Sequence, residues 1–136
     1  MDASVLVSLF LNDALSPRAD EFVRRLQPQP IVSDFAATEF SSVLNRRVRT
    51  RENSTSEAQC AFQAFDQWLE ITAVRVECDT ADLRQAERFL RRLDLPLRAP
   101  DAIHIAIAQR LNLELATFDA RMADCARSLD IRIAAT

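Results

Sequence analysis

Residues 98–110, RAPDAIHIAIAQR, read as a helix in the interior of the protein. Ile and Ala occupy every side of a helix drawn through this segment, which is typical of a helix that is buried all round. Two polar residues, Asp101 and His104, interrupt the apolar pattern. Burying a carboxylate is costly unless hydrogen bonds or positive charge compensate it. The placement of Asp101 therefore calls for a functional or structural reason.

Strands and helices alternate on both sides of this segment, and the strands are too far apart along the chain to pair through hairpins. This order predicts a single α/β domain over residues 1–136, an α/β/α sandwich that is rich in helix and has a short central parallel sheet covered on both faces. The expected strands are 30–34, 73–78, 113–117 and 131–133. Besides the opening segment, the expected helices are 3–11, 17–27, 35–51, 54–70, 80–94 and 119–130.

Composition narrows the possible functions. The chain contains no Gly, which excludes the Gly-rich phosphate loops of nucleotide-binding proteins. All 17 basic residues are Arg, and a net charge of −3 neither demands nor forbids a nucleic-acid partner. No apolar run approaches the ~20 residues that span a bilayer, and the early run SVLVSLFL lacks the features of a signal peptide, so we expect a cytoplasmic protein. Cys60, Cys78 and Cys125 form no CxxC pair and are expected to be buried thiols without a functional role.

Four acids fall at related positions in this plan. Asp119 follows the predicted strand 113–117 by one residue, and Asp2 lies just before an apolar helix, where a first strand would end. Glu39 lies a little over one turn into its helix, and Asp101 lies in the first turn of the opening helix. Helix N-termini favour a carboxylate by about 0.3–1 kcal/mol each. Taken singly, the three Asp residues have a simpler interpretation as helix caps or first-turn acids, and Glu39 as an exposed helix residue.

Taken together, the four acids suggest a metal site. Repulsion and desolvation would raise the pKa values of clustered carboxylates, so a positive charge is expected among them. Oxygen ligands without a His/Cys cluster favour Mg²⁺ or Mn²⁺. Such ions activate water and stabilise the leaving oxygen in phosphodiester hydrolysis.

Four segments carry a family resemblance across nearly the whole chain: DASVLVSLFL, ATEFSSVLNRR, LRAPDAIHIAIAQ and LATFDARMADCA. In this order and spacing they resemble the PIN domain, and specifically the VapC toxins of bacterial toxin–antitoxin pairs. The resemblance implies a Mg²⁺- or Mn²⁺-dependent endoribonuclease that cuts structured RNA, commonly tRNA or ribosomal RNA. It also implies a homodimer and inhibition by a small VapB antitoxin whose tail enters the acidic groove.

The resemblance also implies roles for individual residues. It matches Asp2, Glu39, Asp101 and Asp119 to the family's metal-binding quartet, and Ser4 and Thr117 to the small hydroxyl residues beside it. Our hypothesis is that the three Asp residues hold the metal directly or through water, and that Glu39 is either a ligand or the group that orients the attacking water. For Asp124 we favour a role on a helix surface over one in the site.

Two further residues have alternative interpretations. His104 is three residues beyond Asp101 on nearly the same helix face, so it either donates a hydrogen bond within the site or is a structural residue, and we favour the structural role. Arg46 is two helical turns, about 10 Å, beyond Glu39, and either contacts an RNA phosphate or belongs to a solvated helix end with Arg47, Arg49 and Arg51.

The chain departs from the VapC-like pattern before its first acid. Chains of that type usually place several apolar residues there, whereas here Met1 alone precedes Asp2. We expect the terminal ammonium to lie near the carboxylates and to weaken metal binding. Rival hypotheses are a stand-alone PIN nuclease in RNA processing and a catalytically impaired PIN scaffold that binds RNA or protein. A phosphoacceptor receiver domain is disfavoured, because that signalling fold relies on a Lys and the chain has none.

Overall fold

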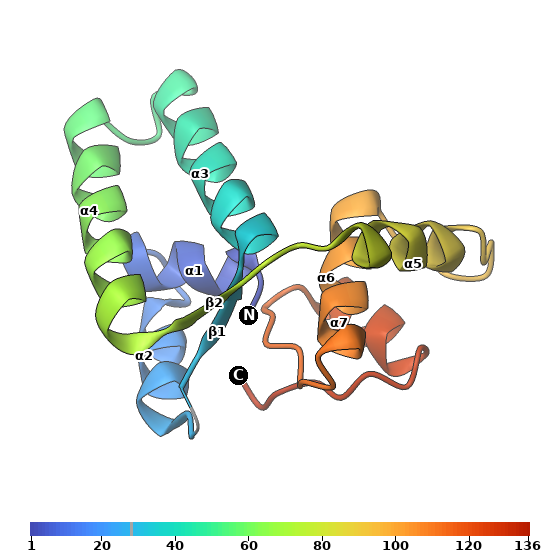
Figure 1. Ribbon diagram of the computed structural model, residues 1–136. Coiled ribbons are helices and arrows are strands. Elements are labelled where there is room, and N and C mark those ends of the chain that lie inside the picture. The colour runs from blue at the N-terminus through green and yellow to red at the C-terminus, as the bar shows by residue number, and fades with distance from the viewer. Residues whose placement is uncertain (28) are drawn as a thin grey trace.

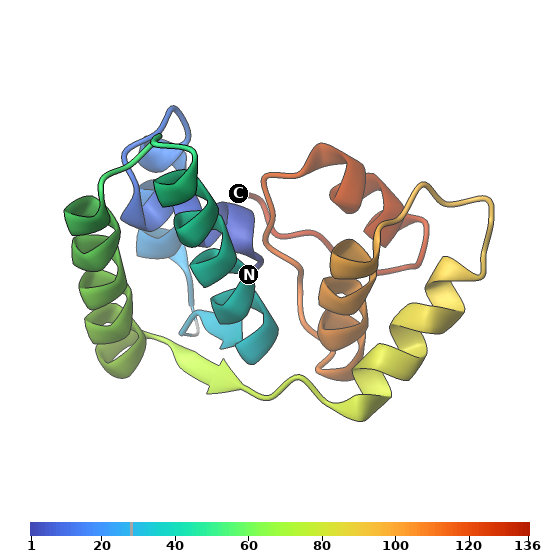
Figure 2. The ribbon, with the colours of Figure 1, turned by 90° about the horizontal axis from the view of Figure 1, so that it is seen from above.

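The computed structural model describes residues 1–27 and 29–136, which form two groups of helices side by side (Figures 1 and 2). The first group contains α1 (Ala3–Phe10), α2 (Ser16–Arg25), α3 (Asp34–Arg49) and α4 (Thr55–Thr72). The second group contains α5 (Thr80–Leu90), α6 (Ala99–Arg110) and α7 (Ala120–Arg127). Every predicted helix is present, and the boundaries differ by a few residues.

Local sequence signals explain where several helices begin. Ser54 caps α4 and exchanges hydrogen bonds with Glu57 in a capping box. Asp79 and Asp82 form the same arrangement at the start of α5, which begins at Thr80 as predicted and is capped by Asp79 rather than by Thr80 itself. An Asp side chain is a stronger cap acceptor than a Thr hydroxyl.

The sheet is shorter than the sequence predicts. Strands β1 (Ile31–Ser33) and β2 (Val74–Val76) pair in parallel, with Val32 opposite Arg75. The predicted strands 113–117 and 131–133 reduce to one parallel bridge between Leu115 and Ile133. The expectation that both faces of the sheet are covered fails at β2, whose Val74 is 43% exposed. The fold class is nevertheless confirmed, because the protein is helix-rich with a short parallel sheet.

The first two residues link the sheet to the bridged segment. The Met1 amino group donates to the Ile31 carbonyl at 2.8 Å, and the Asp2 N–H donates to the Ala116 carbonyl at 3.0 Å. Residues 1–2 therefore lie between β1 and residues 115–117, where a strand of a continuous sheet would lie. This position fixes Asp2 close to the C-terminal third of the chain.

Two main apolar clusters stabilise the two groups of helices. In the first, aromatic rings from α1, α3 and α4 contact one another edge to face, as Phe10 does with Phe40 at 5.8 Å and with Trp68 at 5.5 Å between ring centroids. In the second, α6 packs against α5, and its Ala102 and Ile105 have no exposed surface. The prediction that α6 is buried all round is confirmed along most of its length.

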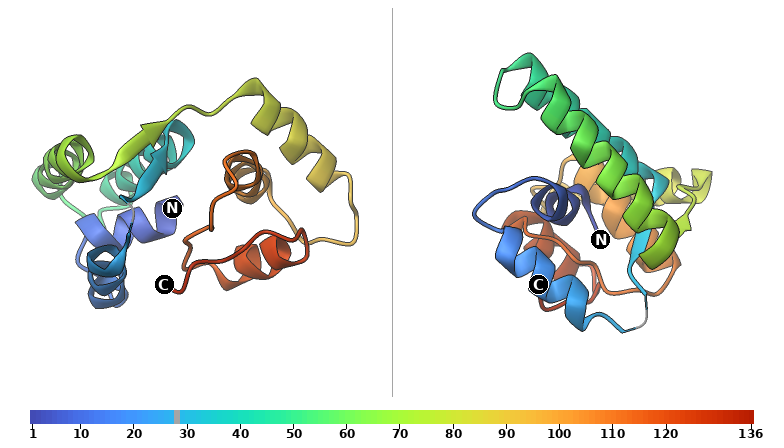
Figure 3. Two further views of the ribbon diagram at one scale, coloured as in Figure 1. Left: turned by 60° about the horizontal axis from the view of Figure 1, so that its bottom comes forward. Right: turned by 90° about the vertical axis from the view of Figure 1, so that its left-hand side faces the viewer.

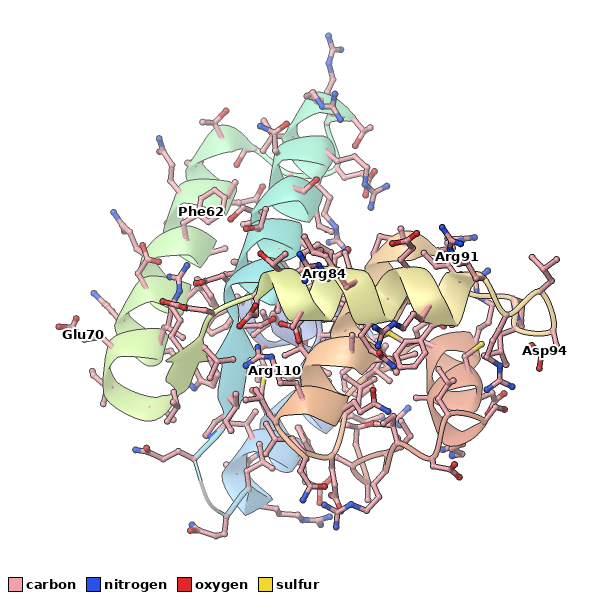
Figure 4. All side chains as sticks on the ribbon, turned by 45° about the vertical axis from the view of Figure 1, so that its right-hand side comes forward. Phe62, Glu70, Arg84, Arg91, Asp94 and Arg110 are labelled. Carbon is pink, nitrogen blue, oxygen red and sulfur yellow. The ribbon has the colours of Figure 1, made fainter. Side chains whose placement is uncertain are left out.

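An ion pair between buried Asp82 and solvent-exposed Arg110 also joins α5 to α6. Asp82 is 1% exposed and accepts two hydrogen bonds from the Arg110 guanidinium, at 2.7 and 2.8 Å. Arg110 lies beside the start of α5 in Figure 4, and it also donates to the Glu77 carbonyl at 2.9 Å. A buried carboxylate that is paired in this way orients the two helices relative to each other.

The antiparallel pair α3 and α4 projects from the rest of the molecule (Figures 1 and 3). A short turn connects the two helices at the outer end, and Arg51 in this turn has a φ of 60°. Exposed Arg46 and Arg49 lie in the last turn of α3, so the projecting end is positively charged.

Candidate functional site

Asp2 and Asp119 cap neighbouring helices and are connected through Thr117. The Asp2 carboxylate, only 3% exposed, accepts at Oδ1 from the Ser4 hydroxyl (2.7 Å) and from the backbone N–H groups of Ser4 and Val5. Its Oδ2 accepts from the Thr117 hydroxyl at 2.7 Å, and the Asp119 N–H in turn donates to that hydroxyl at 2.9 Å. Ser4 and Thr117 therefore both position the Asp2 carboxylate.

Asp119 and Asp101 are connected through Arg121. Asp119 Oδ1 accepts from the N–H groups of Arg121 (2.9 Å) and Met122 (3.1 Å), which caps α7. The Arg121 guanidinium lies 3.6 Å from Oδ2 of Asp101, in the first turn of α6. The same Oδ2 accepts from the Arg98 N–H at 3.2 Å. The Asp119–Arg121–Asp101 contacts place the starts of α6 and α7 next to each other.

Glu39 reaches the same helix at a different residue. Its Oε2 lies 2.5 Å from Nε2 of His104, one turn beyond Asp101 on α6. The His104 side chain is only 4% exposed, against 27% for Glu39, and the Phe35 ring contacts the imidazole edge to face at 5.0 Å between ring centroids. His104 is thus a buried residue, which agrees with the structural role that we favoured. It also makes a hydrogen bond to Glu39, a candidate site residue, and such a bond was the other role considered for it. The two interpretations are compatible.

The helix-cap interpretation is therefore correct for Asp2 and Asp119, and Asp101 is a first-turn acid of α6. Both oxygens of the buried Asp2 carboxylate already accept hydrogen bonds, whereas the other three acids each keep one oxygen available. Within the described residues, Asp101 Oδ1, Asp119 Oδ2 and Glu39 Oε1 accept no side-chain or capping hydrogen bond from the protein. A carboxylate that is fixed through one oxygen and open at the other suits a metal ligand. The N-termini of α1, α6 and α7 add partial positive charge that lowers the cost of gathering these acids.

The donor chemistry fits Mg²⁺ or Mn²⁺, because every candidate ligand is a carboxylate oxygen. The spacing is looser than a metal centre requires, since among the described residues no three His, Cys, Asp or Glu side chains are close enough to hold one ion. Two positive groups lie among the acids, the Arg121 guanidinium and the Met1 amino group. Burial lowers the pKa of the Met1 amino group below its usual value, and the Asp2 charge partly opposes this shift.

The other residues selected from the sequence lie away from these acids. Asp124 is exposed and pairs with Arg127 at 2.7 Å, which supports its expected role on the helix surface. Arg46 is exposed near the projecting end of α3. Cys125 is buried as predicted and Cys78 is half-buried, but the expectation was wrong for Cys60, which is exposed because it lies on the outer face of α4.

A cavity of about 370 Å³ lies beside the acids and is a separate feature. Its walls come from β1, from the end of α6 and from the segment around Leu115, and they include Met1, Ile31, Ile107 and Leu115. None of the four acids lines it, although His104 does. The cavity is therefore the space between β1 and residues 113–116, and Met1 forms part of its wall.

Arg121 is the residue that sequence reasoning missed. It lies two residues after Asp119, inside the quoted segment LATFDARMADCA, so its proximity to one acid was visible. Its proximity to Asp101 depends on the packing of α6 beside α7, which local spacing does not reveal.

Among the described helices, none combines the length and apolar character needed to cross a bilayer.

A short parallel sheet between groups of helices, with carboxylates at converging helix N-termini, defines an α/β domain with an oxygen-donor site. A family model for the PIN domain matches residues 1–128, and the chain belongs to the PIN domain family. The fold also matches the crystal structure of Mycobacterium tuberculosis VapC20, a sarcin-ricin loop cleaving toxin, with a TM-score of 0.72 and 19% identity over 93% of this chain and 92% of the other. No match was found among curated proteins. The expected resemblance to the PIN domain is confirmed, and that to the VapC toxins is confirmed for the fold.

Proposed function

We propose that this chain is a metal-dependent endoribonuclease of VapC type, which hydrolyses phosphodiester bonds in structured RNA such as tRNA or ribosomal RNA. One observation carries the proposal: Asp2, Asp101 and Asp119 lie at the N-termini of three helices and are joined through Thr117 and Arg121. Membership of the PIN domain family supports it. The fold of VapC20, a toxin that cleaves RNA, agrees with it.

Asp2, Asp101, Asp119 and Glu39 would hold Mg²⁺ or Mn²⁺. When bound, the ion activates water for attack and neutralises charge on the phosphate. The protein's own contribution is orientation. Thr117 and Ser4 fix the Asp2 carboxylate, and the buried His104 fixes one oxygen of Glu39 and leaves the other free to orient water.

The proposed partners follow from the same comparison. A small VapB-like antitoxin would neutralise the enzyme, and a homodimer is the proposed assembly. An open reading frame for a small antitoxin next to the gene would support the toxin over a stand-alone PIN nuclease. Light scattering at micromolar concentration would test the dimer, since a monomer at that concentration contradicts it.

The test of cleavage is sequencing of RNA ends after incubation with Mg²⁺ or Mn²⁺. Asp101→Asn keeps the size of the side chain and its bond to the Arg98 N–H while removing the charge, so it should abolish cleavage without unfolding the protein. Asp124→Asn, on the surface of α7, is the matched control and should cleave normally. Cleavage that persists in Asp101→Asn or in excess EDTA contradicts the proposal.

A second candidate is a PIN scaffold that binds RNA or protein without cutting it. Two observations favour it. Among the described residues, no three acids are close enough to bind one metal ion. In addition, the Met1 amino group lies next to Asp2 in the chain, and the Arg121 guanidinium lies beside Asp101. RNA binding by the wild type without new RNA ends in either metal would favour this candidate over the nuclease.

A further inference from the structure

Arg121 places a guanidinium at the mouth of the acidic site. Its Nη2 lies 3.6 Å from Asp101 Oδ2, and its backbone N–H donates to Asp119 at 2.9 Å. The Arg121 side chain is 39% exposed and the Asp101 side chain 14%, so the guanidinium is more accessible to solvent than the carboxylate beside it. A solute that binds at Asp101 can therefore also contact Arg121.

The donors of this guanidinium remain available. The 3.6 Å contact to Asp101 is longer than a hydrogen bond, and within the described residues no protein acceptor takes a hydrogen bond from the Arg121 side chain. Arg110 differs, since it donates twice to Asp82 at 2.7 and 2.8 Å. A planar guanidinium with open donors matches two oxygens of a phosphate group.

Charge around Arg121 also favours an anion from solvent. The N-termini of α6 and α7 both point toward this region and carry partial positive charge. The carboxylates alone would repel a phosphate, and the ion pair between Arg121 and Asp101 offsets part of that repulsion. Its long distance means that little bonding is lost when the guanidinium turns toward a new partner.

We propose that Arg121 is a substrate-binding residue, whose guanidinium holds the non-bridging oxygens of the RNA phosphodiester that lies against Asp101 and Asp119. This inference rests on the proposed function and assigns the phosphate contact of that site. Before RNA binds, Arg121 serves as the counter-charge of Asp101. In the complex, the guanidinium donates to the phosphate instead.

The test compares Arg121→Ala and Arg121→Lys with Arg127→Ala, which removes an exposed Arg of the same helix that is paired to Asp124. RNA affinity is measured by fluorescence anisotropy in EDTA over a range of salt, and KM and kcat are measured with Mg²⁺. Arg121→Ala should weaken RNA binding in EDTA and raise KM by about tenfold or more. Its salt dependence should fall by about 0.7–0.9 in log–log slope. Arg121→Lys should recover part of the affinity, because it keeps the charge and loses the planar fork.

Two results would overturn the inference. One is an RNA affinity and KM for Arg121→Ala equal to those of Arg127→Ala. The other is tighter Mn²⁺ binding by Arg121→Ala with unchanged RNA affinity, which would make Arg121 only a counter-charge for Asp101. If the wild type binds RNA but never cuts it, the nuclease proposal fails, while the comparison in EDTA still decides the role of Arg121.

Discussion

Filling the cavity beside β1 should stabilise the protein. The perturbation is a short apolar extension, Met-Val-Ile-Val, attached to the amino group of Met1. That group already donates to the Ile31 carbonyl, and the Asp2 N–H donates to the Ala116 carbonyl, so an extension would continue between β1 and the segment around Leu115. It would also replace a buried ammonium with a neutral peptide group.

The change in the free energy of unfolding is the gain from burying apolar side chains minus the entropy cost of ordering the added backbone. Each apolar side chain buried in the cavity of about 370 Å³ should contribute about 1.5–3 kcal/mol. Ordering the backbone costs about 1–2 kcal/mol per residue. Three seated residues should therefore give a net gain of about 2 kcal/mol. With an unfolding entropy of about 2.1 cal/mol/K per residue, 136 residues give about 0.29 kcal/mol/K, so Tm should rise by about 7 °C.

The assay is thermal unfolding followed by circular dichroism, together with hydrogen exchange at the amides of Leu115 and Val74. The control is a polar extension of equal length, Met-Ser-Asp-Ser, which cannot bury apolar side chains against the apolar part of the lining, including Ile31, Ile107 and Leu115. The apolar version should be the more stable and should slow exchange at Leu115. Equal Tm values for the two extensions would show that apolar residues before Met1 do not pack beside β1.

Two further substitutions and one thiol-labelling experiment test individual contacts and the burial of the cysteines. Asp82→Ala removes a buried carboxylate that accepts from Arg110 and from the Asp79 N–H, and should lower the free energy of unfolding in urea by about 1–3 kcal/mol. Ala at the exposed Asp94 should change it by less than about 0.5 kcal/mol; similar losses for both would contradict a stabilising role of the Asp82 contacts. Thr117→Val removes a buried donor to Asp2 and should cost about 1–3 kcal/mol, a loss that Thr117→Ser should largely avoid if the hydroxyl is the cause. A maleimide at pH 7 should label exposed Cys60 first, because burial raises the pKa of the Cys125 thiol; a peptide map with Cys125 labelled first would contradict this order.

Local chemistry made much of this fold predictable. Pro17, the cap at Ser54 and the all-apolar faces of α6 act within one or two helical turns, so the sequence pattern suffices to place those helices. The strands at 113–117 and 131–133 were overestimated because a strand needs a partner of matching length. Here the segments touch through one bridge, which their own residues do not reveal.

For the candidate site, the sequence also predicted the local features and not the long-range contacts. Asp2, Asp101 and Asp119 could be chosen from the sequence because each lies at the cap or in the first turn of a helix, and a helix start is a local feature. The contacts that join the acids are of long range. Thr117 reaches Asp2 across 115 positions of the chain, and Glu39 meets His104 across 65. The burial of His104 was inferred from its apolar neighbours, whereas its bond to Glu39 required the packing of α3 against α6.

The most direct test of the central claim is Mn²⁺ binding, measured by titration calorimetry on the wild type, Asp101→Asn and Asp124→Asn. If the acids at the starts of α1, α6 and α7 form one divalent-metal site, the wild type and Asp124→Asn will bind Mn²⁺ alike. Asp101→Asn will then bind it more than about tenfold more weakly. Equal binding by all three proteins, or no binding by the wild type, would contradict the account.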